Sequence, residues 1–216
     1  MARGWSQLVV IKQFFVQALM PEFCVSCHEE GSLFCAACQM KWEPEPIVDA
    51  AAFSCGSYKD KVLQSLLQFW KYQYVENARA ALLDIVGQAL QDYHWVFPDV
   101  EAVTYVPLHW RKANERGFDQ ARMIAERVAE ELQVPCLTLL NRDRYTTPQA
   151  RVERSERTAD KFMGVFGQAP SLPAEPLPSL LLVDDVMTTG TTLGAARDIL
   201  KAAGAPQVTI FTIARG

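Results

Sequence analysis

Two adjacent acids, Asp184 and Asp185, separate a strongly apolar run from a threonine-rich turn. The residues after them combine hydroxyl donors with one glycine: Thr188, Thr189, Gly190, Thr191 and Thr192. A helix that starts at such a turn offers free N–H groups and the positive end of its dipole to a phosphate. The carboxylates only accept hydrogen bonds, so they suit ribose hydroxyls or a hydrated magnesium ion. The pattern therefore predicts a site for a ribose 5-phosphate with magnesium.

Other phosphate-binding patterns fit this segment less well. No Gly-Lys-Ser/Thr follows the acids, which excludes a Walker A loop, and the glycine spacing excludes a dinucleotide fingerprint. A receiver-type acid pair would lie on an early strand, whereas this pair lies late in the chain. The remaining alternative is an ordinary strand with a helix-capping turn, which explains the threonines but not two adjacent acids.

Four of the six cysteines lie within fifteen residues, as two Cys-x-x-Cys pairs: Cys24, Cys27, Cys35 and Cys38. Each pair can place two thiolates on one tight turn, and two such turns can complete a tetrahedral zinc site. The short spacing between the pairs leaves a rubredoxin-like iron site open, and a redox-active pair or unrelated reduced thiols are the alternatives without a structural metal. We expect structural zinc, in a reducing compartment. Cys55 and Cys136 are expected to be small core residues.

Half of the 216 residues are apolar, enough for one full core and a small appendage. The net charge of -4 gives no global attraction to nucleic acid or anionic membranes, so such contacts would need a local patch. Residues 5–20 are apolar but contain Lys12, Gln13 and Gln17, which argues against a signal peptide, and they are too short to span a bilayer. An amphipathic helix that packs on the protein is expected here, with interfacial membrane contact as the alternative. The expected location is the cytoplasm, with no transmembrane segment.

The chain divides into an amino-terminal part, residues 1–48, and a larger domain, residues 49–216. Residues 49–97 are predicted to be largely helical and could form a hood, and residues 98–216 are predicted to hold the sheet core. Apolar runs predict strands at 102–106, 136–140, 162–166, 180–183 and 208–213, and apolar periodicity predicts helices at 119–132 and 191–203. Strands that alternate with helices indicate an α/β fold with a parallel sheet whose faces are covered.

The segment from Arg142 to Lys161 has no apolar face and is rich in arginine, threonine and acids. It is long for a connection inside a compact domain, and such segments are usually lids or disordered linkers. We expect a lid over the phosphate site.

Residues 183–192 resemble the phosphoribosyl-pyrophosphate (PRPP) motif of type I phosphoribosyltransferases. Three further features resemble the competence protein F (ComF) family: the paired cysteines, residues 115–120 (ERGFDQ), and residues 147–149 (TPQ) followed by Arg157 and Phe166. Residues 69–73 (FWKYQ) also fit this family. The resemblance covers nearly the whole chain and keeps the motif order. It implies a type I phosphoribosyltransferase-like parallel sheet flanked by helices, with an amino-terminal four-cysteine zinc knuckle and a helical segment.

The resemblance also implies roles for individual residues. The turn 188–192 would hold the 5-phosphate of PRPP, and Asp184 and Asp185 would hold its ribose hydroxyls. Arg111 and Lys112 would meet the pyrophosphate, with Arg116 as a helper, because arginine matches phosphate oxygens in geometry. Positions 119 and 160 are both Asp in this chain, whereas the family usually has Asn at each of them. Both exchanges remove amide donors and add negative charge near an anionic ligand.

The family implies a role in natural transformation, in which the protein handles single-stranded DNA beside a DNA-translocating helicase. One alternative is an active phosphoribosyltransferase of nucleotide salvage or biosynthesis, which would release pyrophosphate. Another is a non-catalytic binding module that uses the pocket as a sensor or a DNA-interaction surface. The sequence identifies no residue that would bind an incoming base and no general acid or base.

Overall fold

A five-stranded sheet forms the centre of the computed structural model, which describes residues 22–73, 76–108, 118–142, 166–168 and 176–216. The strand order across the sheet is β1 (Ile47–Asp49), β2 (Ala52–Ser57), β7 (Val208–Arg215), β6 (Leu180–Met187) and β3 (Ala102–Tyr105). Strands β2, β7, β6 and β3 pair in parallel, and β1 joins β2 as an antiparallel edge. The predicted α/β fold with a parallel sheet is confirmed.

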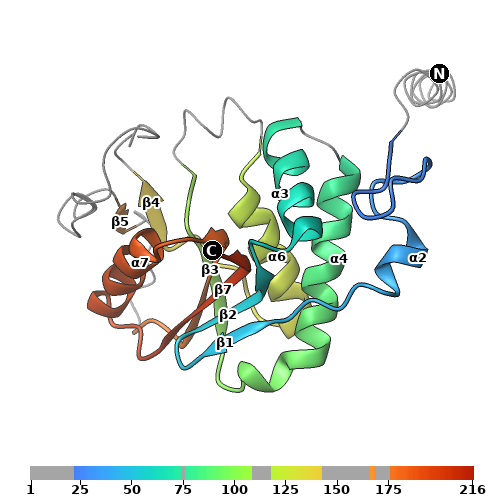
Figure 1. The fold of residues 1–216 in the computed structure, drawn as a ribbon. Coiled ribbons are helices and arrows are strands. Elements are labelled where there is room, and N and C mark those ends of the chain that lie inside the picture. The colour runs from blue at the N-terminus through green and yellow to red at the C-terminus, as the bar shows by residue number, and fades with distance from the viewer. Residues whose placement is uncertain (1–21, 74–75, 109–117, 143–165, 169–175) are drawn as a thin grey trace, which may run out of the picture.

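Helices cover both faces of this sheet (Figure 1). One face carries α3 (Lys61–Gln73), α4 (Glu76–Tyr93) and α6 (Gln120–Leu132), and the other carries α7 (Thr191–Ala202). Alternate residues of β6 serve the two cores, because successive side chains of a strand point to opposite faces. Leu181 and Val183 pack with the first group of helices, whereas Leu180 and Leu182 pack with α7.

Strand β2 was not predicted, since residues 49–97 were expected to be largely helical. Its sequence, AFSCGS, is short and mixes small polar with apolar residues, so it carries no clear period. Burial of the strand is nevertheless complete apart from its last residue. Its buried Ser54 hydroxyl is 2.7 Å from the Thr212 hydroxyl of β7, so each satisfies the other inside the sheet.

The strand predicted at 136–140 does not extend the parallel sheet, and Phe166, the one described residue of the strand predicted at 162–166, lies in another sheet. Only a single bridge joins Cys136 to Val103 of β3. The chain then forms β4 (Leu140–Arg142), which pairs antiparallel with β5 (Phe166–Gln168) in a separate two-stranded sheet. Leu139 and Leu140 are buried in the core beneath α7, and this burial draws the chain away from the edge of the main sheet. Residues 162–165 lie outside the described residues.

Two short elements complete the described chain, α2 (Ala36–Gln39) and the 3-10 helix η1 (His94–Val96). Gly204, two positions after the end of α7, has φ +100°, as expected for a residue that ends a helix. None of the helices in the described part of the chain is long and apolar enough to cross a bilayer. The helix predicted at residues 5–20 lies outside the described residues.

Candidate functional site

The acid pair lies at the carboxyl end of β6, where the strand leaves the core. Residues 180–183 of β6 are buried, and Asp184, Asp185 and Val186 are only partly so. Strand β6 is longer than the predicted 180–183 because it continues alongside β7 as far as Met187. Its neighbour β3 pairs only up to Val183, so the acids lie just beyond the end of that pairing. Ligands of parallel sheets bind at such an edge.

The turn after β6 leads directly into α7. Gly190 is the residue that precedes the helix, and its φ of +70° lies in the left-handed region, which favours glycine. No side chain caps the first amides of α7. Thr188 and Thr189 are exposed, and the Thr189 hydroxyl lies 2.9 Å from that of Thr191. Uncapped amides and short hydroxyl donors thus lie together at a helix start, an arrangement suited to an anion.

The acids, Thr192 and parts of four other segments surround one cleft of about 190 Å³. Its remaining lining residues come from α3, the end of β3, the start of α6 and β4: Lys71, Val106, Leu108, Asp119, Gln120, Ala121 and Arg142. Segments far apart in the sequence therefore build a single polar cavity. Sequence reasoning gave no site role to Lys71 or Gln120, and it placed Arg142 only as the first residue of the predicted lid.

Lys71 forms an ion pair with Asp185, with 2.6 Å between Nζ and Oδ2. Both side chains are largely shielded from solvent. The sequence signal for Lys71 was its position in residues 69–73, which the resemblance highlighted without a role. The neighbouring Trp70 ring stacks on Phe118, with centroids 6.0 Å apart and planes 5° from parallel. Two segments that the sequence associated with one family therefore contact each other.

Asp119 ties the exit of β3 to the start of α6. Its Oδ2 accepts a hydrogen bond from the Leu108 N–H at 2.8 Å, and its Oδ1 accepts one from the Arg122 N–H at 3.3 Å. A carboxylate offers an oxygen to each donor, whereas an amide has only one oxygen. These two backbone hydrogen bonds give a local structural reason for aspartate, instead of asparagine, at position 119. Burial raises the pKa of Asp119 despite these hydrogen bonds.

Burial and the adjacent Asp185 charge raise the pKa of Asp184 to about 8, although Lys71 opposes the shift. Burial also lowers the pKa of Arg142, while the charges of Asp184 and Asp119 act in the other direction. A carboxyl group held this close to a second acid loses its proton readily once a cation arrives. The cleft therefore suits an anionic ligand accompanied by a divalent cation.

Several predicted site residues cannot be placed. Arg111, Lys112 and Arg116 lie outside the described residues, as do residues 143–161 of the predicted lid. Arg142, the first residue of that segment, belongs to β4 and lines the cleft.

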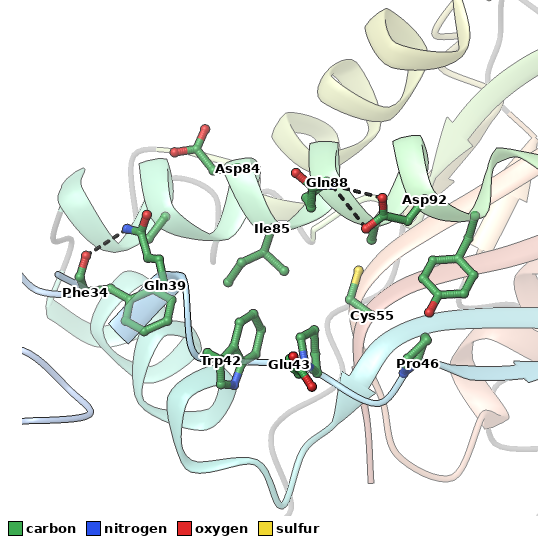
Figure 2. Close-up of a pocket in the computed structure, with 14 residues that line it drawn as sticks. Phe34, Gln39, Trp42, Glu43, Pro46, Cys55, Asp84, Ile85, Gln88 and Asp92 are labelled. Carbon is green, nitrogen blue, oxygen red and sulfur yellow. Dashed lines mark hydrogen bonds between the residues drawn. The ribbon is translucent and has the colours of Figure 1, made fainter. Parts of the chain in front are cut away.

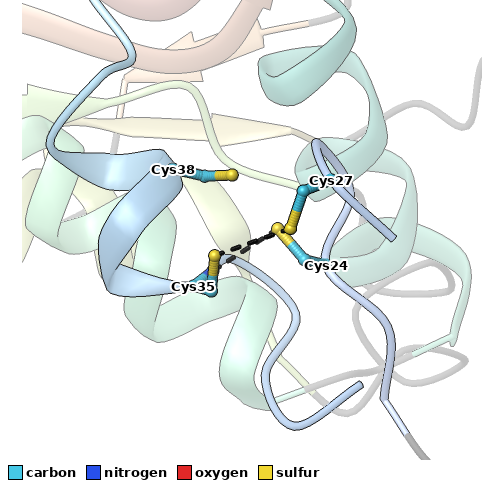
Figure 3. Close-up of side chains that lie close together, drawn as sticks. All are labelled: Cys24, Cys27, Cys35 and Cys38. Atoms are coloured by element: carbon cyan, nitrogen blue, oxygen red, sulfur yellow. Dashed lines mark hydrogen bonds between the residues drawn. The ribbon is translucent and has the colours of Figure 1, made fainter. Parts of the chain in front are cut away.

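The four clustered cysteines form a second candidate site, a metal centre. All four Sγ atoms lie within 4.8 Å of one another, and those of Cys27 and Cys35 are 3.7 Å apart. Figure 3 shows the thiols converging from two separate turns. Four sulfurs around one tetrahedral zinc would lie about 3.8 Å apart, given Zn–S bonds of about 2.3 Å. The residues therefore fit one metal ion.

The surroundings of Cys24 favour a thiolate. Burial opposes ionisation, but backbone N–H groups of Cys27, Cys35 and Ser26 outweigh it and lower the pKa of Cys24 to about 6. All six cysteines are free thiols. Although backbone hydrogen bonds oppose the shift, burial and hydrogen bonds with neighbouring thiols instead raise the pKa of Cys27 and Cys35, so a metal, which requires deprotonated sulfur, would displace protons from these two.

The cysteine knuckle is packed onto the rest of the protein. Cys24, Leu33 and Phe34 belong to the same buried core as α3 and α4. Trp42 packs edge-on against Phe34, and its indole N–H donates to Asp60 Oδ2 at 3.0 Å. The metal centre is thus coupled to the fold of the larger domain.

Comparisons with known proteins agree with this architecture. Residues 119–216 match the model of the phosphoribosyl transferase domain. Competence protein F of Haemophilus influenzae is 27% identical over 198 residues, which cover 89% of this chain and 84% of that protein. Competence protein ComFC of Bacillus subtilis is 26% identical over 229 residues, which cover 98% of this chain and 91% of that protein.

A solved structure, glutamine phosphoribosylpyrophosphate amidotransferase from B. subtilis in complex with ADP and GMP, matches 68% of this chain and 30% of its own. The TM-score is 0.46 and the identity is 20%. Most of the chain is thus similar to competence proteins F and ComFC, and residues 119–216 are similar to phosphoribosyl transferase domains.

Proposed function

We propose that the cleft beside Asp184 binds PRPP or a related ribose phosphate together with Mg²⁺. One observation carries this proposal: the carboxylate pair at the end of β6 adjoins the uncapped start of α7. A ribose 5-phosphate needs both features at once, because its hydroxyls require acceptors and its phosphate requires donors. In this proposal Asp184 and Asp185 hold the ribose hydroxyls, and the 5-phosphate lies on Thr188, Thr189, Gly190, Thr191 and Thr192.

The pyrophosphate end of PRPP would lie toward the cations. Lys71 and Arg142 line the cleft, and we propose that they contribute positive charge there. Arg111, Lys112 and Arg116 keep their proposed pyrophosphate role on the basis of sequence. Mg²⁺ held in the cleft would supply positive charge and so reduce the repulsion between the ligand and three acids, namely Asp119, Asp184 and Asp185.

At the level of the cell, we propose a role in natural transformation, with single-stranded DNA and a DNA-translocating helicase as partners in the cytoplasm. The names of the relatives, competence proteins F and ComFC, support this role. We further propose that the metal in the cysteine knuckle is zinc and that it is structural. Four thiolates would fill its coordination sphere and leave no open position for a substrate.

Isothermal titration of the full chain with PRPP and Mg²⁺ tests the ligand assignment. The double variant Asp184→Asn/Asp185→Asn should bind at least about 100-fold more weakly, since two charge-assisted hydrogen bonds are lost. Asp198→Asn, an exposed acid on α7, is the matched control and should bind normally. Equal affinities for the double variant and the parent protein would refute the proposal. Pyrophosphate released in the presence of a base would show turnover in addition to binding.

A further inference from the structure

A second and larger cavity, of about 430 Å³, lies between α4 and the segment that connects the cysteine knuckle to β1 (Figure 2). Its apolar walls include Phe34 and Trp42 on one side and Ile85 on the other. None of its lining residues also lines the cleft at Asp184. The proposed ligand site therefore does not explain this cavity.

Three acids lie among the lining residues, Glu43, Asp84 and Asp92. The Asp92 carboxylate accepts hydrogen bonds from Gln88 Nε2 at 3.0 and 3.1 Å, and no residue that lines the cavity is basic. An occupant that combines an apolar body with positive charge would match both properties of this surface.

Three exposed large apolar side chains lie close in sequence to residues that line the cavity. Met40, Val48 and Trp95 are 81%, 45% and 63% exposed, and each lies within two residues of a position that lines the cavity. Only one other large apolar side chain in the described part of the chain is exposed to this degree, Phe23. Exposed apolar side chains of this size often mark a surface that another polypeptide segment covers.

We propose that residues 1–20 of the same chain occupy this cavity as an amphipathic helix. Leu8, Ile11, Phe15 and Leu19 would face the apolar walls. Arg3 and Lys12 are the only charged residues in this segment, which contains no acid. The segment thus has the charge and the apolar face that the cavity requires.

The place where the described chain begins supports this assignment. Glu22 accepts a hydrogen bond from Asn77 Nδ2 at 2.7 Å, so the described residues begin beside the first turn of α4. The cavity residues of α4 begin at Ala81 and extend to Tyr93, roughly 6 to 24 Å further along the helix axis. A helix over residues 1–20 would be about 30 Å long, enough to follow that stretch.

An antiparallel alignment with α4 also matches the charges. Arg3 and Lys12 would be separated by about 14 Å along one helix, and Asp84 and Asp92 by about 12 Å along the other. If positions along the two helix axes are counted from the contact between Glu22 and Asn77, Lys12 lies within about one helical turn of Asp84, and Arg3 lies within about one turn of Asp92. Long side chains can span such a gap. Tethering removes most of the entropic cost of association, so modest contacts suffice.

Zero-length carbodiimide cross-linking of the full chain, followed by peptide mass spectrometry, tests the docking. The reagent joins an amine to a carboxylate in direct contact. A link from Lys12 to Asp84 or Glu43 is expected, in the monomer band of a denaturing gel. The Lys12–Asp84 link should be lost in Asp84→Asn and kept in Asp198→Asn, whose exposed acid lies on α7.

Several outcomes would overturn the docking. One is a monomer in which Lys12 is linked to neither acid, and another is a link found only in dimers, which would assign the cavity to a second copy. Sedimentation with phosphatidylglycerol vesicles that depends on Lys12, without the intramolecular link, would assign the segment to a membrane surface instead. The test does not measure PRPP affinity, so its result can refute the docking without bearing on the proposed function.

Discussion

The Lys71 ammonium lies 2.6 Å from the Asp185 carboxylate, although 114 positions separate the two residues in the chain. Helix α3 crosses one face of the sheet and delivers this cation to the carboxyl end of β6. The contact links a segment outside the phosphoribosyl transferase match, which covers residues 119–216, to the acid pair inside it. The residues before 119 therefore take part in the candidate site.

Replacement of Lys71 by methionine should weaken PRPP binding by roughly 10-fold or more. The variant removes a cation from a cleft that holds three acids, and a charge-assisted hydrogen bond contributes about 1.5–3 kcal/mol. Titration calorimetry with Mg²⁺ measures the effect. Lys61→Met, at the exposed start of the same helix, is the control and should bind like the parent protein. Unchanged affinity in Lys71→Met would remove Lys71 from the site.

The raised pKa of Asp184 predicts a pH-dependent stability. Burial raises the pKa of this carboxyl to about 8 in the folded protein, whereas in the unfolded chain the pKa has its ordinary value of 3.8. The resulting stabilisation is complete below the unfolded pKa and is lost as the pH rises through the folded pKa. Asp184→Asn, which resembles the protonated acid, should gain stability relative to the parent protein as the pH rises from 5 to 9.

Denaturant unfolding at each pH, without Mg²⁺ or ligand, measures this difference. Asp198→Asn is the matched control, because its carboxylate is exposed and its stability curve should run parallel to that of the parent protein. If the Asp184→Asn curve also runs parallel, the carboxyl is ionised in the folded state and its pKa is not raised.

The elements with strong apolar patterns were predictable from sequence. Helices α6 and α7, the buried part of β6 and strand β7 lie within a few residues of the predicted ranges. Strand β2 was missed because its small mixed residues follow no period, and its burial depends on tertiary partners such as Thr212. The separate β4–β5 sheet was missed because local apolar runs do not specify which strands pair.

The residues of the candidate sites also divide into those that the sequence identified and those that it did not. The cysteine spacing predicted the metal cluster, because its ligands lie close together in the sequence. The acid pair and the glycine turn were also readable as one local motif. The contribution of Lys71 was not, because a contact across 114 positions leaves no local pattern. The sequence identified Asp119 only as a departure from the family's usual Asn. Its two backbone hydrogen-bond donors, the N–H groups of Leu108 and Arg122, come close to it only in the folded chain.

Removal of the metal should unfold the amino-terminal knuckle and destabilise the larger domain with it. Cys24, Leu33 and Phe34 share the core of α3 and α4, so loss of the knuckle exposes that core. Cys24→Ser should reduce metal content, measured by elemental mass spectrometry, and lower the melting temperature by several degrees. Cys136→Ser should retain the metal, since Cys136 lies outside the cluster. Equal metal content in the two variants would exclude the four-cysteine centre.

Gly190, which precedes α7, and Gly194, which lies inside it, provide a paired test of the phosphate turn. Gly190 has φ +70°, so Gly190→Ala should cost about 1 kcal/mol of unfolding free energy and should also weaken PRPP binding. Gly194 lies inside α7, where a Cβ would meet open space, so Gly194→Ala should stabilise the protein by about 0.5–1 kcal/mol. Denaturant unfolding and PRPP titration of both variants measure these effects. Because the substitution is the same at both positions, opposite signs would isolate the backbone conformation at Gly190 as the cause. A stabilised Gly190→Ala variant that still binds PRPP normally would show that the left-handed turn is not needed to hold the phosphate.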